Sequence, residues 1–310
     1  MTIVDGVLVV DKPAGPTSHD IVLEVRRLLP RRTRVGHTGT LDPAATGVLP
    51  LCLGSATRLS RFLTATRKLY SGIIHLGVST DTYDADGQIT ARRDAGGIDP
   101  AAIRSAAASL AQSVTQVPPV FSARKVSGEP MHRLARRGVS LSPDPATVTI
   151  HKLVILSVDM PEVAFEAETS PGTYIRSLAH DLGEALGCGA HLASLRRTAS
   201  GRFTMQQAHT MDEIFEGARH RRLIELIVPA ARLDLGMPTV VAGPTGVRAM
   251  RHGRGLGFAD LTTPASEVIG LGGAASRVRI LDDSGQLLGV AVLSGPGGAD
   301  VLRPEVVLAV

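Results

Sequence analysis

The sequence of 310 residues contains no tryptophan, three tyrosines and only two cysteines. Two cysteines are too few for a disulfide framework or for a cysteine-based metal site. The apolar runs fall far short of the ~18 residues that a membrane-spanning helix needs. Residues 1–10 also lack the basic segment of a secretory signal. We therefore expect a cytoplasmic protein of ordinary globular composition, 44% hydrophobic and 20% charged.

Motifs of several enzyme classes are also missing from the sequence. The ten histidines show no zinc-binding spacing, and there is no P-loop, dinucleotide-binding fingerprint or Gly-x-Ser-x-Gly elbow. Residues 84–87 resemble part of a calcium loop, but the twelfth loop position holds Arg93 where a glutamate is needed. An Asp-Gly hairpin turn explains this segment better. What remains is carboxylate chemistry, for which we expect no metal.

The net charge is only +4, but the basic residues are clustered. Residues 26–37 hold five arginines and no acid, and further basic clusters lie in 124–137, 196–202 and 219–222. Acids gather in other segments, such as 81–86. Such segregation is typical of a protein that turns one face to a polyanion, so nucleic acid is the partner we favour. A solvated surface is the alternative, since only four of the 33 basic residues are lysine.

Hydrophobic periodicity predicts a mixed α+β fold. Short alternating or apolar runs predict strands at 7–10, 69–78, 147–158 and 162–168. Capping signals and a 3.6-residue period predict the helices. These run from Thr17 or Ser18 to Pro30, over 56–64, from Asp99-Pro100 to Leu110, over 175–186, and onward from Thr210.

The character of the sequence changes near residues 231–238, and this change predicts a domain boundary. We place a first domain at 1–233 and a second at 234–310. In the second part, a short helix at 246–250 and a hairpin signal at 283–285 predict a small β-rich domain.

Residues 36–50 combine three glycines, two prolines and three threonines around one carboxylate, Asp42. Glycine and proline together fix an unusual backbone course. We interpret the stretch as a loop that holds a site with Asp42 and His37. An ordinary surface turn is the alternative, because the same residues also mark simple turns.

Tyr174 and Arg176 fall at the start of a predicted helix, where the positive end of the helix dipole favours anions. An arginine is unfavourable at this position. We therefore expect Arg176 to have an anionic partner nearby, unless its side chain simply lies on the surface.

Residues 115–140 are polar, basic and interrupted by proline. This composition fits an arm that becomes ordered on a partner, or a plain surface excursion.

Residues 36–47 closely resemble the catalytic motif of the TruB-type tRNA pseudouridine-55 synthases. Other stretches resemble motifs of the same family in the same order: 11–18, 68–70 with 80–87, 119–125, and 172–176 with 191–197. The resemblance covers about residues 5–230 and favours the site interpretation of 36–50. Beyond it, the chain resembles the family's PUA-type RNA-binding domain only in position and strand pattern.

The resemblance implies a pseudouridine-synthase fold, with a largely antiparallel mixed sheet flanked by helices. It also implies isomerisation of uridine 55 in the tRNA T-arm loop, by base flipping and without a cofactor. Asp42 matches the essential aspartate, which acts as a nucleophile at C1′ or as a base at the 2′ position. Arg176 matches its ion-pair partner.

Other residues are expected to contact the RNA. His37, Tyr70, Tyr174 and Leu195 match the substrate-contacting positions of the family, and Tyr70 would offer the reacting uridine a stacking surface. The 115–140 arm matches the thumb insertion that grips the T-arm. Basic residues expected at the substrate are Lys12, Arg124, Lys125, Arg133, Arg136, Arg137, Arg196 and Arg197.

Two alternatives stay open from the sequence. The chain could be a tRNA-binding or tRNA-folding protein whose catalysis is secondary, or a related synthase that acts on ribosomal RNA with guide partners. For the chain itself we expect a monomer.

Overall fold

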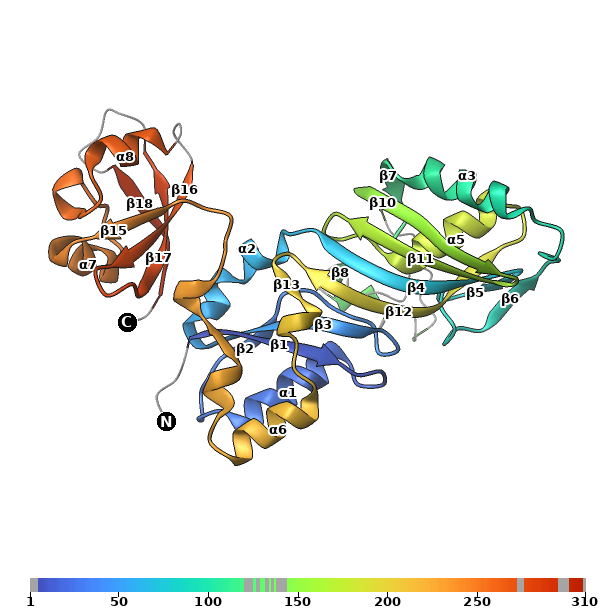
Figure 1. Ribbon diagram of the computed structural model, residues 1–310, viewed down its shortest axis with the longest axis horizontal. Helices are drawn as coiled ribbons and strands as arrows, with labels where there is room; N and C mark the ends of the chain where they lie inside the picture. Colours follow the sequence, from blue (N-terminus) through green and yellow to red (C-terminus); the bar gives the residue numbers. More distant parts are fainter. Residues whose placement is uncertain are drawn as a thin grey trace.

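The computed structural model describes residues 5–119, 125–126, 129–131, 134, 137, 144–271, 276–294 and 301–308. They form a large sheet with helices against it and a smaller C-terminal sheet at one end (Figure 1). Within these residues, no helix is both long and apolar enough to cross a membrane.

The large sheet has ten strands in the order β14-β1-β3-β12-β4-β11-β10-β7, with β2 beside β3 and β13 beside β12. All pairs are antiparallel except β3 with β12. This confirms the expected largely antiparallel mixed sheet. Its strands are β1 (Gly6–Lys12), β2 (Val35–His37), β3 (Thr46–Leu53), β4 (Lys68–Leu76), β7 (Ser113–Gln116), β10 (Ala146–Asp159), β11 (Glu162–Thr169), β12 (Ala190–Ser200), β13 (Phe203–Thr204) and β14 (Ile227–Pro229).

The stretch 36–50 is not one continuous loop, as its glycines and prolines suggested. The run from Val48 to Leu53 is buried throughout, and a run buried on both faces favours a strand over a loop. Residues 46–50 therefore belong to β3, and residues 36–37 belong to β2. The connection shrinks to residues 38–45, which we name the Asp42 loop.

The core lies on both faces of the large sheet because side chains alternate along each strand. In β1, Leu8 and Val10 join the cluster that includes apolar residues of α1, α3 and α5. Val7 and Val9 join a second cluster, which reaches Val290 and Val306 of the C-terminal sheet. The two sheets are thus linked by buried apolar contacts.

The helices begin where the capping signals predicted them. Capping boxes formed by Thr17 with Asp20 and by Thr210 with Glu213 open α1 and α6, and Asp99 caps α3. The segment 56–64 is helical as expected, but its first part is a 3-10 helix. The helices here are α1 (Ser18–Leu28), η1 (Gly54–Leu59), α2 (Ser60–Thr64), α3 (Pro100–Leu110), α5 (Ile175–Ala185), η2 (Met205–Gln207), α6 (Met211–Arg219), η3 (Leu223–Leu226) and η4 (Ala230–Arg232).

A small hairpin brings further acids to the large sheet. Strands β5 (Val78–Thr80) and β6 (Ile89–Arg92) pair around the predicted Asp-Gly turn. A bridge between Asp84 and Leu192 fastens this turn to β12.

The C-terminal sheet has the order β15-β16-β17-β18, and the predicted hairpin joins β16 to β17. The side chain of Asp282 accepts hydrogen bonds from the backbone amides of Ser284 and Gln286 and so fixes the turn. The division at 233/234 and an RNA-binding role for this part stay predictions. Its elements are β15 (Thr239–Ala242), α7 (Pro244–Arg251), η5 (Phe258–Asp260), α8 (Ala265–Gly270), β16 (Arg277–Asp282), β17 (Leu287–Leu293) and β18 (Leu302–Val307).

The predicted 115–140 arm lies largely outside the described residues. Its described part includes the short pair β8 (Lys125–Val126) and β9 (Glu129–Pro130), and Arg137 donates to Glu129 at 2.8 Å. Arg124, Arg133 and Arg136 lie outside the described residues, as does the side chain of Lys125.

Candidate active site

The Asp42 loop connects β2 to β3 and lies where β3 meets β12. Thr46 and Gly47 pair there with Arg196 and Arg197. Gly47 has φ +101°, and a Cβ at this position would lie 2.2 Å from the Arg197 carbonyl oxygen. Only glycine permits both this backbone conformation and this close approach. The glycine therefore fixes the distance between the loop and β12.

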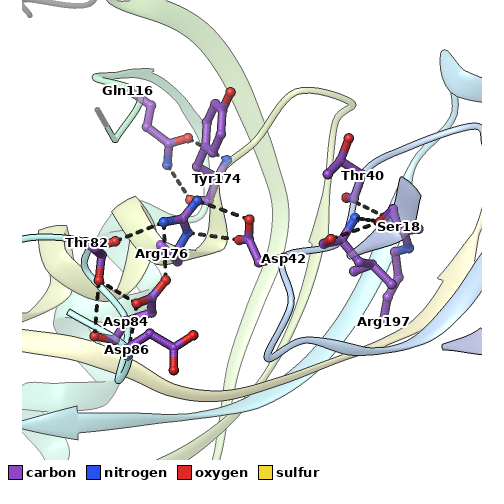
Figure 2. Close-up of polar contacts among 11 residues, drawn as sticks. Ser18, Thr40, Asp42, Thr82, Asp84, Asp86, Gln116, Tyr174, Arg176 and Arg197 are labelled. Carbon is purple, nitrogen blue, oxygen red and sulfur yellow. Dashed lines mark hydrogen bonds and ion pairs between the residues drawn. The ribbon is translucent and has the colours of Figure 1, made fainter. Parts of the chain in front are cut away.

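Two buried cations hold the loop through its backbone carbonyls. Lys12 is fully buried, and its Nζ donates to the carbonyls of Pro13, Pro43 and Ala45 at 2.8–2.9 Å. Arg197 is 1% exposed and donates to the carbonyls of Gly39, Thr40 and Val48 at 2.7–3.3 Å, as Figure 2 shows in part. A hydrogen bond from a charged group contributes about 1.5–3 kcal/mol, so these contacts restrain the loop strongly.

Ser18 adds a third tie at the N-terminus of α1. Its hydroxyl donates to the Leu41 carbonyl at 2.9 Å and accepts from the Leu41 amide at 2.8 Å. Both the backbone amide and the backbone carbonyl of the residue before Asp42 are therefore held.

The Asp42 carboxylate forms a bidentate pair with Arg176 (Figure 2). Nε of Arg176 lies 2.9 Å from Oδ2 of Asp42, and Nη2 lies 3.2 Å from Oδ1. The arginine side chain is only 6% exposed, whereas that of Asp42 is 42% exposed. The cation is thus fixed behind the carboxylate, which keeps an open side toward solvent.

Arg176 also pairs with a second acid, Asp84. Its Nη1 lies 3.2 Å from Oδ2 of Asp84 and donates to the Thr82 carbonyl at 3.1 Å. The backbone amide and carbonyl of Tyr174, the N-cap of α5, are both hydrogen-bonded to the Gln116 side chain. The predicted anionic partner of Arg176 is confirmed, and it consists of two carboxylates.

The pKa of Asp42 is raised above its usual value, chiefly because burial disfavours the charged form. Arg176 opposes this shift, and the neighbouring charge of Asp84 adds to it. Arg176 was expected as the ion-pair partner of Asp42, and it does favour the charged form. In the structure burial outweighs it, so the carboxylate is more basic than an ordinary aspartate.

Four other predicted positions lie around this pair. Tyr70 is 7% exposed, and burial raises the pKa of its hydroxyl, so little of the side chain reaches solvent. His37 is half-buried, with its pKa lowered by burial and by Arg197. Tyr174 is half-buried at the N-cap of α5.

Leu195 lies on β12 and lines a cavity of about 380 Å³. Ala44 and Thr46, which flank the end of the Asp42 loop, line the same cavity. The cavity therefore adjoins the end of the Asp42 loop, and its size is within the range of small-ligand sites.

Lys12 and Arg197, which were expected at the substrate, hold the backbone of the protein itself in this structure. Both side chains are buried, and their donors are occupied by backbone carbonyls, because a buried cation must be satisfied inside the protein. Arg196 is 41% exposed but pairs with Asp11 at 2.7 Å.

Sequence reasoning missed Asp84, Gln116 and Ser18 as parts of this site. Asp84 belongs to a motif that carried the resemblance, so its acid could have been assigned. Gln116 gave no local signal. Within the described residues no group of three or more His, Cys, Asp or Glu side chains could hold a metal ion.

Comparison with known proteins agrees with this geometry. Residues 26–175 match the TruB family pseudouridylate synthase N-terminal domain, and residues 176–233 match the tRNA pseudouridylate synthase B C-terminal domain. The chain is 40% identical over 301 residues to tRNA pseudouridine synthase B of Burkholderia mallei, covering 97% of this chain and 96% of that protein. It is 43% identical over 249 residues to the protein of the same name from Syntrophotalea carbinolica, covering 80% and 81%.

Solved structures show the same fold. An H/ACA RNP bound to a substrate RNA containing 2′-deoxyuridine matches with TM-score 0.72 and 24% identity, over 98% of this chain and 84% of that chain. A Cbf5-Nop10-Gar1 complex matches with TM-score 0.72 and 25% identity, over 97% and 83%. With matched segments that span the Asp42 loop, Arg176 and β12, the chain belongs to the TruB family of pseudouridylate synthases.

Proposed function

We propose that this protein converts uridine 55 in the T-arm loop of tRNA to pseudouridine. The observation that carries the proposal is the Asp42 carboxylate, open to solvent on one side and held from behind by the buried Arg176. The reaction cleaves the C1′–N1 bond, turns the base and rejoins it through C5. A fixed, unusually basic carboxylate suits this task either as a nucleophile at C1′ or as a base at the 2′ position.

The geometry suits an Asp42 carboxylate that the protein itself positions, without help from the substrate. Lys12, Arg197 and Ser18 hold the Asp42 loop before any RNA arrives. A carboxylate that is already oriented needs no reorganisation in the transition state.

The flipped uridine has a place beside the loop. Removing the uridine from its stack costs a few kcal/mol, and contacts in a fitted pocket offset this cost. The cavity at Leu195 is adjacent to the loop, and Gly72 in its wall allows β4 to approach β12 closely, because a Cβ there would lie 2.5 Å from the Ser194 carbonyl oxygen. We assign base contacts to Leu195, Tyr70 and Tyr174.

Relatives support tRNA as the substrate class. The protein named tRNA pseudouridine synthase B from Burkholderia mallei covers 97% of the chain at 40% identity. The preference for uridine 55 and for the T-arm rests on the family alone. The arm 115–140 and the part of the chain after residue 233 are assigned to RNA binding on the same ground.

The test is pseudouridine formation in unmodified tRNA by the purified chain. Asp42→Asn should abolish it, because the amide is neither a nucleophile nor a base. Asp86→Asn is the matched control, since this exposed acid lies in the neighbouring hairpin and should leave the rate unchanged. Pseudouridine made by Asp42→Asn would refute the assignment.

Two other functions would give different results in the same assay. A tRNA-folding protein without catalysis would bind tRNA tightly and form no pseudouridine. A guide-dependent synthase would need partners, so turnover of a T-arm hairpin by the chain alone excludes it.

A further inference from the structure

A second cavity, lined mostly by polar and charged residues, lies at the opposite end of β3 from the Asp42 loop. It has a volume of about 300 Å³ and lies between the connection from α1 to β2 and the start of η1. We name it the arginine pocket, and its lining residues are Asp5, Arg32, Thr33, Arg34, Gly54, Ser55 and Arg58.

The charge of the arginine pocket is not balanced from within. Arg32, Arg34 and Arg58 line it, and arginine keeps its charge at every physiological pH. Its one acid, Asp5, already accepts from the amide and hydroxyl of Ser55. Among the described residues, no carboxylate forms an ion pair with any of the three arginines.

The backbone around the arginine pocket is held in a defined conformation. Arg32 has φ +74°, a conformation that is costly for a residue with a Cβ and often marks functional sites. The next residue, Thr33, is buried and holds the Pro30 carbonyl with both its amide and its hydroxyl. Gly54 donates to the Arg34 carbonyl at 2.8 Å. The backbone that carries Arg32 and Arg34 is therefore fixed by hydrogen bonds.

The arginine pocket also adjoins the C-terminal sheet, because the Arg58 guanidinium donates to the Val307 carbonyl. That acceptor is neutral and leaves the positive charge uncompensated. Three guanidinium groups around one cavity repel one another, and a bound anion removes this repulsion.

We propose that the arginine pocket binds a phosphate of the tRNA backbone, at a segment outside the nucleotides that contact Asp42. The proposal rests on the proposed function, since tRNA is the polyanion it supplies. The eight residues of β3 separate the arginine pocket from the Asp42 loop by roughly 23 Å. Arginine suits the ligand, because its planar fork pairs with phosphate oxygens bidentately.

The experiment compares full-length tRNA with a T-arm hairpin. The variant combines Arg32→Gly with Arg34→Ala, and glycine relieves the left-handed backbone, so the fold is retained. The control combines Arg67→Ala with Arg93→Ala, which removes the same formal charge from exposed positions outside the arginine pocket and outside the basic clusters. Binding is measured from 50 to 300 mM salt, and pseudouridine formation in the hairpin is measured in parallel.

We expect the pocket variant to bind full-length tRNA about ten-fold more weakly at 0.15 M salt. The slope of log K against log salt should become shallower by about one to two. Hairpin turnover should match that of the wild type. Unchanged tRNA affinity, or an equal loss in the control, would overturn the proposal. A pocket that binds only free phosphate would give the first of these results. Absence of pseudouridine in the wild-type hairpin reaction would instead overturn the proposed function and leave the binding result readable.

Discussion

Replacing Arg176 by methionine tests how the Asp42 carboxylate is controlled. Methionine keeps most of the buried volume but removes the charge. The change leaves Asp42 and Asp84 without their shared cation, whose side chain is 6% exposed. Breaking a buried ion pair costs about 3–5 kcal/mol. Because the Asp42 side chain is 42% exposed and water screens it, we expect the lower end, about 3 kcal/mol of unfolding free energy.

The activity of the same variant should change in its pH dependence. Arg176 lowers the pKa of Asp42 against the effect of burial, so removing it raises that pKa further. The reaction needs the carboxylate, and its rate falls as the pH drops through the pKa. The acid limb of kcat/KM should therefore move to higher pH. A contact with a charged group contributes about 1.5–3 kcal/mol, which corresponds to one to two pH units.

Asp84→Asn should shift the acid limb in the opposite direction. The charge of Asp84 raises the pKa of Asp42, so its removal should move the acid limb to lower pH. Arg93→Met is the matched control, because Arg93 pairs with Glu184 on the surface, with about half of each side chain exposed. It should change neither the limb nor, by more than about 0.5 kcal/mol, the stability. Initial rates from pH 4 to 8 and urea unfolding measure both quantities. An acid limb that stays in place in Arg176→Met would refute the electrostatic account.

Three further predictions concern the loop and the arm. Burial lowers the pKa of Lys12 to about 8, whereas a lysine of an unfolded chain titrates near ~10.4. The unfolded state therefore binds more protons between these values, so stability should rise with pH there, and urea unfolding of Lys12→Met should show a smaller rise. Gly47→Ala should lower the unfolding free energy by well over 2 kcal/mol, because it combines a positive φ with a clash. Gly15→Ala, at φ +106° in open space, should cost only about 1 kcal/mol, and equal losses would contradict the clash. Alanine at Arg133, Arg136 and Arg137 together should make the salt dependence of tRNA binding shallower, and an unchanged slope would mean that the arm does not meet phosphates.

Local rules predicted most elements of the fold. The capping boxes at Thr17 and Thr210 and the Asp99-Pro100 start placed three helices correctly, since these signals act within one helical turn. The unfavourable place of Arg176 at a helix start correctly predicted an acid nearby. For the three helix starts, the cause lies within a few residues of the effect.

Long-range packing decided what the sequence did not show. Lys12 and Arg197 were assigned to the substrate by their charge, but their burial depends on how β1, β3 and β12 assemble. The upward shift of the Asp42 pKa has the same origin, because burial exceeds the effect of the arginine. The extension of β3 to residue 46 was hidden by Gly47 and Pro50, which resemble turn residues until the neighbouring strands are known.

The separation of the site residues along the chain has a consequence for synthesis. Asp42 and Arg176 are 134 positions apart, and the loop carbonyls are held by Arg197 from β12. Contacts between distant residues form late, after the intervening chain has been made. A ribosome that has produced only the first half of this protein has already released the acid but neither of these two arginines. The nascent chain would therefore acquire an oriented, paired carboxylate only once β12 has closed against β3.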